Sequence, residues 1–353
     1  MQDINQSAVK ELESLLISSA KTAIVTHMKP DGDALGSSIA MYHFLSRYGR
    51  TRKIILSDPY PSNLDFIVSG IEEDILVHTE QPTDAEEFIK DADLIVCLDF
   101  NAFHRTDRLE GPLAESKARK VLIDHHLNPD RDCFDIIFSE TEISSASELL
   151  FQILMQMPSV ERQADKLPMA ANEAMMTGMT TDTNNFANSV FPSTLQMASV
   201  LLEAGVNRDK ILLNIYNRFS ESRLRLLGHI MKDLLRITDS GVAYIVLDSN
   251  TLQEYNVIEG DTEGFVNMPL SISDVKMSIL IKEDIGKARV SIRSKKGTSA
   301  NMCARTYFNG GGHENAAGGR LNIPGDIENI AQASAYIEEK TTKFMTEENE
   351  KNI

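Results

Sequence analysis

The feature that most constrains the fold is a set of short apolar runs that end in acidic or histidine residues. Three of them, 24–26, 94–98 and 121–123, lack the regular alternation of apolar and polar residues. Such runs are typical of parallel strands that are buried on both faces of a sheet. Strands are expected at 22–26, 53–57, 74–78, 93–99, 120–124 and 134–138, with helical segments between several of them. The chain is therefore predicted to be α/β, with an N-terminal parallel sheet.

Residues that can bind a metal or a phosphate follow these runs. The first run leads into the loop His27-Met28-Lys29-Pro30-Asp31-Gly32-Asp33, the second into Asp99, and the third into Asp124-His125-His126. Asp182 lies in a similar position after a later helix. Because open parallel sheets bind ligands at the carboxyl ends of their strands, His27, Asp99 and Asp124–His126 are expected along one edge.

Each of these residues also has an ordinary structural explanation when it is taken alone. Asp31-Gly32 is a good turn dipeptide, and Asp99 and Asp182 could cap helices or form Asx turns. Two adjacent imidazoles after a buried strand have no obvious structural use. The occurrence of all four groups at strand or helix ends favours one shared site.

The remaining sequence indicates a second domain. A chain of 353 residues exceeds what one core usually supports. The pattern is helical after residue 143 and returns to β character from Gly241. We expect a catalytic domain at 1–220, a helical linker at 221–240, a smaller mixed α/β domain at 241–345 and a polar tail at 346–353.

Charge limits the class of ligand. The net charge of −17 argues against binding long nucleic acid, whose affinity comes mostly from phosphate neutralisation. The segment 285–313 nevertheless contains no Asp or Glu and carries six cations: Lys287, Arg289, Arg293, Lys295, Lys296 and Arg305. This basic segment suits a small anionic ligand, although a basic strand pair at the surface would have the same composition.

A glycine run closes the basic segment. Gly310, Gly311 and Gly312 precede His313. Consecutive glycines let backbone N–H groups approach a phosphate, and a helix beginning after them would add its dipole. A flexible loop is the alternative, but the neighbouring cations favour ligand binding.

The acidic and histidine residues indicate a metal centre of hard ligands. Imidazoles and carboxylates without thiolate suit Mn²⁺, or Mg²⁺ less well, and do not suit structural zinc. So many acids would repel one another without cations. Two divalent ions about 3.5–4 Å apart would balance this charge and favour displacement at phosphorus. The residues therefore predict a dinuclear phosphoesterase.

Cysteine content and hydropathy give an expected location. The three cysteines, Cys97, Cys133 and Cys303, show no CxxC spacing and are expected to be reduced. No stretch of 18 apolar residues occurs, and the N-terminus lacks the basic and apolar regions of a signal peptide. A cytoplasmic protein that does not bind membranes is expected.

In order and spacing, these motifs resemble those of the DHH phosphoesterase family with its DHH-associated C-terminal domain, most closely the NrnA-like branch of nanoRNases and pAp phosphatases. The segment His27–Asp33 resembles its first motif, Asp99 the second, Asp124–His126 the third and Asp182 the fourth, while Gly310–His313 resembles the signature of the associated domain. Asn184 stands where glycine is expected in many relatives, which leaves the local shape of that loop open.

The resemblance implies a role for each residue of the site. His27 and Asp31 would bind one Mn²⁺, the other would be bound by Asp33, His125 and Asp182, and Asp99 would bridge the two. Asp124 would orient the imidazole of His125, as carboxylates near metal sites commonly do. His126 would lie close to the scissile phosphate. Arg293, Gly310, Gly311, Gly312 and His313 would hold the substrate's phosphate and base.

The expected activity is hydrolysis of short nucleotides by water that a dinuclear metal centre activates. Candidate substrates are oligoribonucleotides of two to five nucleotides, dinucleotides such as pApA or c-di-AMP, and pAp, giving 5′-mononucleotides. Mg²⁺ or Co²⁺ could replace Mn²⁺, and a homodimer is plausible. The alternatives are a RecJ-type single-strand exonuclease, an inorganic pyrophosphatase of the same superfamily, and a nucleotide-binding regulator without catalytic activity.

Overall fold

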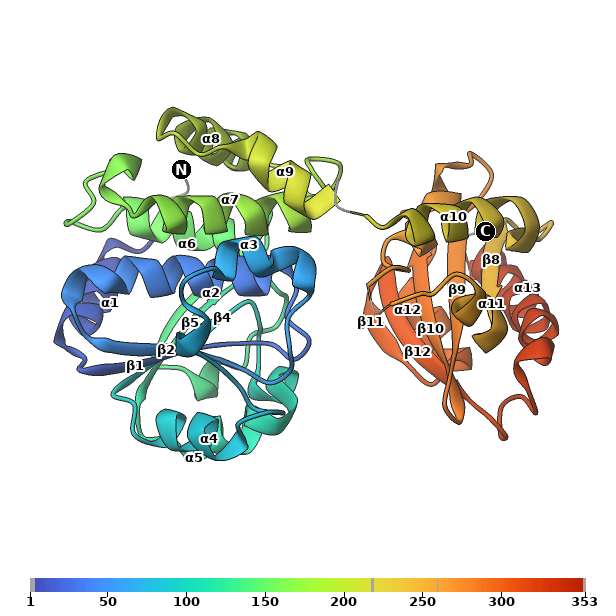
Figure 1. Ribbon diagram of the computed structural model, residues 1–353, viewed down its shortest axis with the longest axis horizontal. Helices are drawn as coiled ribbons and strands as arrows, with labels where there is room; N and C mark the ends of the chain where they lie inside the picture. The colour runs from blue at the N-terminus through green and yellow to red at the C-terminus, as the bar shows by residue number, and fades with distance from the viewer. Residues whose placement is uncertain (1–3, 217–218, 259, 352–353) are drawn as a thin grey trace. The chain divides into compact units, whose positions relative to one another are not determined.

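The chain divides into two compact units, Met1–Arg218 and Phe219–Ile353. The computed structural model describes residues 4–216, 219–258 and 260–351, with side chains except at 313 and 348–351. Figure 1 shows that each unit contains its own sheet with helices packed against it.

The first unit is built on a six-stranded sheet in the order β3-β2-β1-β4-β5-β6, in which every strand pair is parallel. The strands are β1 (Lys21–Thr26), β2 (Thr51–Leu56), β3 (Ile75–Val77), β4 (Leu94–Leu98), β5 (Arg119–Asp124) and β6 (Ile136–Ser139). The α/β class is thereby confirmed. Strand order reverses between β1 and β4, and ligands of open parallel sheets bind at such a point.

Helices cover both faces of this sheet. Figure 1 shows α2 (Gly32–Leu45), α6 (Ala146–Met155) and α7 (Met169–Asp182) on one face, and α4 (Pro82–Lys90) and α5 (Glu110–Glu115) on the other. Neighbouring residues of a strand pack into the cores on opposite faces of the sheet. Ile24 packs with the first set of helices and Val25 with the second. The other helices of this unit are α1 (Gln6–Ser18), α3 (Asp65–Val68), α8 (Pro192–Glu203) and α9 (Arg208–Tyr216).

Helices α2 and α7 approach each other closely because glycines lie at their contact. A Cβ atom at Gly36 would lie 2.6 Å from the carbonyl oxygen of Ala174, and one at Gly32 would lie 2.3 Å from Oγ1 of Thr181. Both distances are too short for a side chain. The absence of Cβ atoms therefore lets the first turn of α2 lie beside the last turn of α7.

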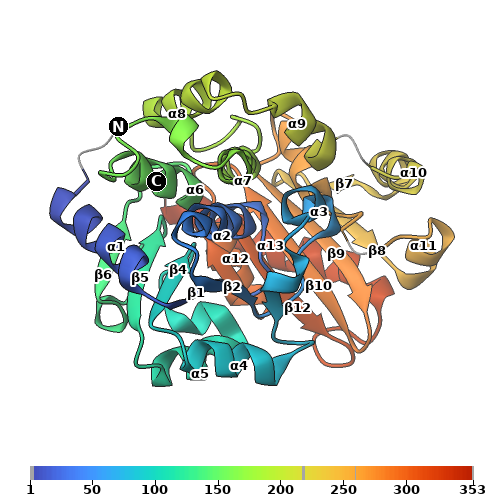
Figure 2. The ribbon, with the colours of Figure 1, turned by 60° about the vertical axis from the view of Figure 1, so that its left-hand side comes forward.

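The second unit contains a mixed sheet in the order β11-β12-β10-β9-β8-β7, in which only the β8–β9 pair is parallel. The strands are β7 (Arg236–Ile237), β8 (Val242–Leu247), β9 (Met277–Asp284), β10 (Lys287–Ser294), β11 (Gly311–His313) and β12 (Ala316–Asn322). Figure 2 shows β8, β9, β10 and β12 side by side. Two helices, α12 (Ala300–Tyr307) and α13 (Ala333–Lys351), contribute to the core on one face.

The segment predicted as a helical linker, 221–240, belongs to the second unit. It forms α10 (Glu221–His229), one turn of π-helix at Ile230–Leu234, and β7. Leu226 and Ile230 are fully buried and pack with Ile245 and Phe265. The apolar face of this helix needs a core to cover it, so the segment cannot act as a free connector.

The polar tail predicted at 346–353 is helical over the part that the structure describes, and residues 352–353 lie outside that part. Helix α13 continues to Lys351, because Phe344 and Met345 are buried in the second core and hold the preceding turn. Within the described ranges, no helix combines the length and apolar character needed to cross a membrane.

Candidate metal centre

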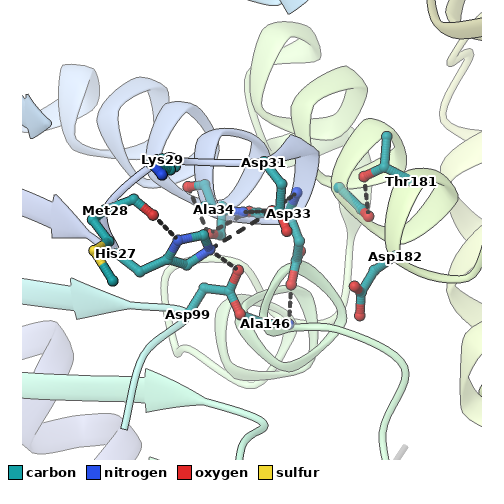
Figure 3. Close-up of polar contacts among 12 residues, drawn as sticks. His27, Met28, Lys29, Asp31, Asp33, Ala34, Asp99, Ala146, Thr181 and Asp182 are labelled. Carbon is teal, nitrogen blue, oxygen red and sulfur yellow. Dashed lines mark hydrogen bonds and ion pairs between the residues drawn. The ribbon is translucent and has the colours of Figure 1, made fainter. Parts of the chain in front are cut away.

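His27 follows β1 and turns its ring toward two carboxylates. Its Nδ1 lies 2.8 Å from the carbonyl oxygen of Met28, which accepts a hydrogen bond from it. Nε2 lies 3.4 Å from Oδ2 of Asp99 and 3.9 Å from Oδ1 of Asp31 (Figure 3). Asp31 is also the N-cap of α2, and its Oδ1 accepts hydrogen bonds from the backbone N–H groups of Asp33 and Ala34. The capping interaction therefore orients a candidate ligand as well.

Asp33 lies in the first turn of α2, and the start of another helix holds it in place. Its Oδ2 accepts a hydrogen bond from the backbone N–H of Ala146 at 2.6 Å (Figure 3). Its Oδ1 accepts one from the backbone N–H of Ser147 at 2.9 Å. Only 1% of Asp33 is exposed. The first backbone N–H groups of α6 thus favour a negative charge at this position.

Asp99 follows β4 and lies centrally among the histidines. Its φ of 64° is in the left-handed region, which aspartate tolerates better than most residues. Oδ2 approaches His27, while Oδ1 lies 3.3 Å from Nε2 of His125 and 3.8 Å from Nδ1 of His126. Oδ1 is buried, yet it has no hydrogen-bond partner of good geometry among the described residues. A buried oxygen of this kind is suited to a cation.

The two histidines of the Asp124-His125-His126 stretch contact different carboxylates. Nε2 of His125 faces Asp99 and lies 3.7 Å from Oδ2 of Asp182, the last residue of α7. Asp124 is fully buried, and its Oδ1 accepts a hydrogen bond at 2.7 Å from Nδ1 of His126. The expectation that Asp124 orients His125 is therefore wrong. Adjacent residues after a strand point in different directions, and the imidazole within hydrogen-bonding distance of Asp124 is that of His126.

The candidate ligands form three groups, and within each group the donor atoms lie within 4.8 Å of one another. The groups are His27, Asp31 and Asp99; Asp33, His125 and Asp182; and Asp99, His125 and His126. Asp99 and His125 each belong to two of them. The donor set of oxygens and imidazole nitrogens fits divalent ions such as Mn²⁺. All six residues proposed as metal ligands are thus brought together.

The electrostatics of the cluster also fit cations. Burial and the charges of Asp99 and Asp182 raise the pKa of Asp33 well above its usual range. Burial raises the pKa of Asp182 to about 7, although His125 opposes the shift. Burial disfavours charge on the imidazoles, but Asp99 outweighs it and raises the pKa of His27 to about 9 and that of His125 to about 10. In the metal-free cluster, bound protons therefore offset part of the negative charge that metal ions would otherwise balance.

Comparison with known proteins agrees with this geometry. Residues 21–179 match the DHH family, N-terminal domain, and residues 239–341 match the DHHA1 domain. The chain is 35% identical to an exopolyphosphatase-related protein from Bacteroides fragilis, whose crystal structure superposes with a TM-score of 0.90 over 99% of this chain and 100% of that one. The chain belongs to the DHH family.

Two DHH relatives resemble the chain over most of its length. One is the bifunctional oligoribonuclease and PAP phosphatase NrnA of Thermus thermophilus, which is 29% identical over 84% of this chain and 83% of that protein. The other is a probable bifunctional oligoribonuclease and PAP phosphatase NrnA of Streptococcus mutans, 27% identical over 87% of this chain and 91% of that protein.

In the DHHA1 domain, Arg293 lies on β10 beside a cavity of about 250 Å³. Lys282, Arg289, Ser291 and Glu263 line the same cavity. The guanidinium of Arg293 donates hydrogen bonds to the carbonyl oxygens of Ile292 and, at 3.5 Å, Ala317. Among the described residues, no carboxylate forms an ion pair with it, whereas Arg289 is paired with Asp284 at 2.9 Å. An anion can therefore be bound at Arg293.

The glycine run has a structural role that the sequence did not reveal. The run leads into a strand and so offers no helix dipole at this point, because Gly311–His313 forms β11 and pairs with β12. A Cβ atom would lie 1.9 Å from the Gly318 carbonyl oxygen at Gly310, and 2.6 Å from that of Ala316 at Gly312. These two glycines are required by the close approach of the strands. The side chain of His313 lies outside the described part of the chain.

The sequence interpretation also missed the residues that hold Asp33. They belong to the segment Ser144-Ser145-Ala146-Ser147-Glu148, in which Ser145 is the N-cap of α6. Ser145 and Glu148 have the S-x-x-E spacing of a capping box, which is a readable signal for a helix start. The loop whose shape Asn184 left open is left-handed there, with φ of 46° at Asn184 and 57° at Asn185.

Proposed function

We propose that this DHH protein is a metal-dependent phosphoesterase that hydrolyses short nucleotides, releasing 5′-mononucleotides from oligoribonucleotides of two to five nucleotides or from dinucleotides such as pApA and c-di-AMP, and AMP from pAp. The observation that carries the proposal is the set of overlapping ligand groups that share Asp99 and His125. The relatives named as oligoribonucleases and PAP phosphatases support a hydrolase.

Two Mn²⁺ ions are the proposed cofactors, and Mg²⁺ or Co²⁺ are possible replacements. His27 and Asp31 would hold one ion, Asp33, His125 and Asp182 the other, and Asp99 both. When bound, two such ions stabilise negative charge at phosphorus and lower the pKa of water. Oδ1 of Asp99 supports this assignment, because it is buried and lacks a hydrogen bond of good geometry among the described residues.

His126 is the proposed catalytic group of the chain itself. Asp124 accepts the Nδ1–H hydrogen bond and so orients the ring, and Nε2 is the nitrogen proposed to act on a substrate. A protonated Nε2 can donate to a phosphoryl oxygen or to the departing ribose oxygen, where negative charge develops. Asp124 would keep the imidazole oriented and stabilise its charge.

Arg293 is the proposed phosphate-binding residue of the DHHA1 domain, with the glycine run and His313 as neighbours of the bound nucleotide. Replacing it, Arg293→Ala, should raise KM about tenfold or more and change kcat less, since binding is lost more than chemistry. Lys287→Ala is the matched control, because this cation lies on the same strand and contacts Asp284 but does not line the cavity. Equal kinetics in the Arg293 variant and the wild type would exclude this assignment.

Short substrates are favoured over long strands because of charge. The net charge of −17 repels a polyanion, whereas a short nucleotide needs only a local group of cations. A RecJ-type exonuclease is the alternative, and it predicts a preference for long single strands.

The test is incubation with Mn²⁺ and a panel of pAp, pApA, c-di-AMP, RNA of two to five nucleotides, pyrophosphate and a long single strand. Chromatography identifies the products. Release of 5′-mononucleotides from the short substrates is the expected result. Turnover of pyrophosphate alone, or of the long strand in preference to the short ones, would overturn the proposal.

A further inference from the structure

Glu148 is a buried carboxylate that the proposed chemistry does not use. Its side chain is fully buried in the first turn of α6, and no described cation forms an ion pair with it. Four hydrogen bonds replace the ion pair. Oε2 accepts from the backbone N–H of Ser144 at 3.2 Å, from the Ser144 hydroxyl and from the Thr194 hydroxyl at 2.7 Å, and Oε1 accepts from the amide of Gln152 at 3.1 Å.

These hydrogen bonds fix the start of α6. Ser145, the N-cap, accepts a hydrogen bond from the backbone N–H of Glu148, while the Glu148 side chain holds the preceding residue, Ser144. Thr194 extends the network to α8, where its hydroxyl also accepts from the backbone N–H of Phe191. One carboxylate therefore connects the beginnings of two helices.

The same helix start holds Asp33. The two N–H groups that bind its carboxylate belong to Ala146 and Ser147, which lie between the N-cap Ser145 and Glu148. A shift of this turn would move both hydrogen-bond donors together. The position of Asp33 therefore depends on the interactions that keep the first turn of α6 in place.

We propose that Glu148 is a positioning residue for the metal centre, acting through the first turn of α6 on Asp33. This rests on the proposed function, in which Asp33 binds one of two ions. Residues that orient metal ligands typically change metal affinity about 10–100-fold when they are replaced. Loss of Glu148 should therefore lower the affinity for the ion held by Asp33. The affinity for the ion held by His27 and Asp31 should remain nearly unchanged.

The test is calorimetric titration of the metal-free protein with Mn²⁺, which resolves the two affinities without an activity assay. Glu148→Ala should weaken one site at least tenfold and leave the other within about threefold. Glu148→Gln retains an acceptor oxygen for Ser144 and Thr194, so it should restore the affinity to within about threefold of the wild type. Thr194→Val, which removes one donor and keeps the shape, should weaken the same site by a smaller factor.

Asn172→Ala is the matched control for a general loss of stability. Asn172 is a buried polar residue of the same unit, and it donates to the carbonyl oxygen of Ala164, away from Asp33. Its replacement should leave both Mn²⁺ affinities unchanged. Equal weakening of both sites in the Glu148 variant, or of either site in the Asn172 control, would show a nonspecific effect and overturn the inference.

Asp33→Ala separates this inference from the proposed function. If Asp33→Ala removes one site and Glu148→Ala removes none, the positioning role is wrong and the ligand set stands. If Asp33→Ala leaves both sites intact, the ligand set itself is wrong. If Glu148→Ala does not fold, the Thr194→Val titration decides, and unchanged affinity there would overturn the inference.

Discussion

Asp99 connects the candidate ligand groups. Each of its oxygens faces a different imidazole, with Oδ2 toward His27 and Oδ1 toward His125. Its left-handed backbone directs the carboxylate into the cluster, and a residue with this conformation at a strand end commonly marks a functional site. A single side chain thereby serves both proposed metal positions.

Asp99→Asn should reduce turnover at least about 100-fold, beyond the effect of residues that only orient a ligand. Asparagine also tolerates the left-handed conformation, so the substitution removes charge and leaves the backbone unstrained. Turnover and Mn²⁺ binding are the measurements. Asp107→Asn is the control, since this aspartate also has a positive φ but lies outside the ligand groups. Near-normal turnover in the Asp99 variant would exclude a bridging role.

The raised pKa values of His27 and His125 predict how pH affects the metal-free protein. Their folded-state values of about 9 and about 10 lie above the usual value of 6.5, so the stabilisation is complete below pH 6.5. It is lost as the pH rises toward 10. Mn²⁺ must displace these protons, so its affinity should increase over the same range.

Urea denaturation in EDTA at pH 7, 8 and 9 measures this effect. The wild type should lose more stability with rising pH than the His27→Gln variant does, because glutamine carries no titrating proton. In saturating Mn²⁺, the free energy of unfolding of the wild type should no longer differ between these pH values. Parallel pH profiles of the two proteins in EDTA would contradict the assignment.

At the residue scale, the sequence predicted which residues would meet but not how they would pair. The strand-end positions of His27, Asp99 and His125 follow from apolar runs and parallel topology. The partner of Asp124 could not be read in the same way, because the choice between two adjacent imidazoles depends on side-chain torsions. Glu148 was missed because its role depends on contacts with residues distant in sequence.

At the element scale, the centre depends on the close packing of helices. Asp33 comes from the first turn of α2 and Asp182 from the last turn of α7, and the glycines between these helices bring the two ends together. Gly178 of α7 faces the same region. A Cβ atom there would lie 2.0 Å from Oγ of Ser147 and 2.8 Å from Oδ1 of Asp33.

Gly178→Ala should therefore destabilise the protein by about 1–3 kcal/mol, as overpacking typically does, and should weaken Mn²⁺ binding at the Asp33 position. Gly111→Ala is the control, because nothing lies within 4 Å of a Cβ atom at that helical glycine. Its stability should be unchanged or slightly higher. Chemical denaturation and Mn²⁺ titration distinguish the two. Equal behaviour of the two variants would show that close packing at Gly178 is unimportant.

The elements around the glycine run carry no comparable signal in the sequence. β11 and β12 contain few of the β-branched and aromatic residues that indicate strands, because their close approach requires glycine. The segment 221–240 was interpreted as a linker, since helical periodicity does not show which unit covers the apolar face. Tertiary packing decided both cases.

At the scale of the whole molecule, the two units have separate cores. The clusters around the parallel sheet contain only residues of the first unit, and those around the mixed sheet contain only residues of the second. All proposed metal ligands belong to the first. A bound metal should consequently stabilise one unit and not the other.

Scanning calorimetry should show two transitions, of which Mn²⁺ raises only one. At 100 times its Kd, a ligand adds about 2.7 kcal/mol, which corresponds to a Tm increase of roughly 5–10 °C for a unit of this size. The Asp99→Asn variant should lose this increase, which assigns the transition to the first unit. A single transition would show that the units unfold together, and an equal shift of two transitions would contradict the restriction of Mn²⁺ stabilisation to the first unit.

The position of the ligands along the chain has a consequence for the unfolded state. They begin at His27, after β1, and end at Asp182, the last residue of α7, so most of the first unit lies between them. A bound ion would join these distant points as a disulfide does, by closing long loops that an unfolded chain would otherwise leave open. The candidate metal centre would then also act as a reversible cross-link.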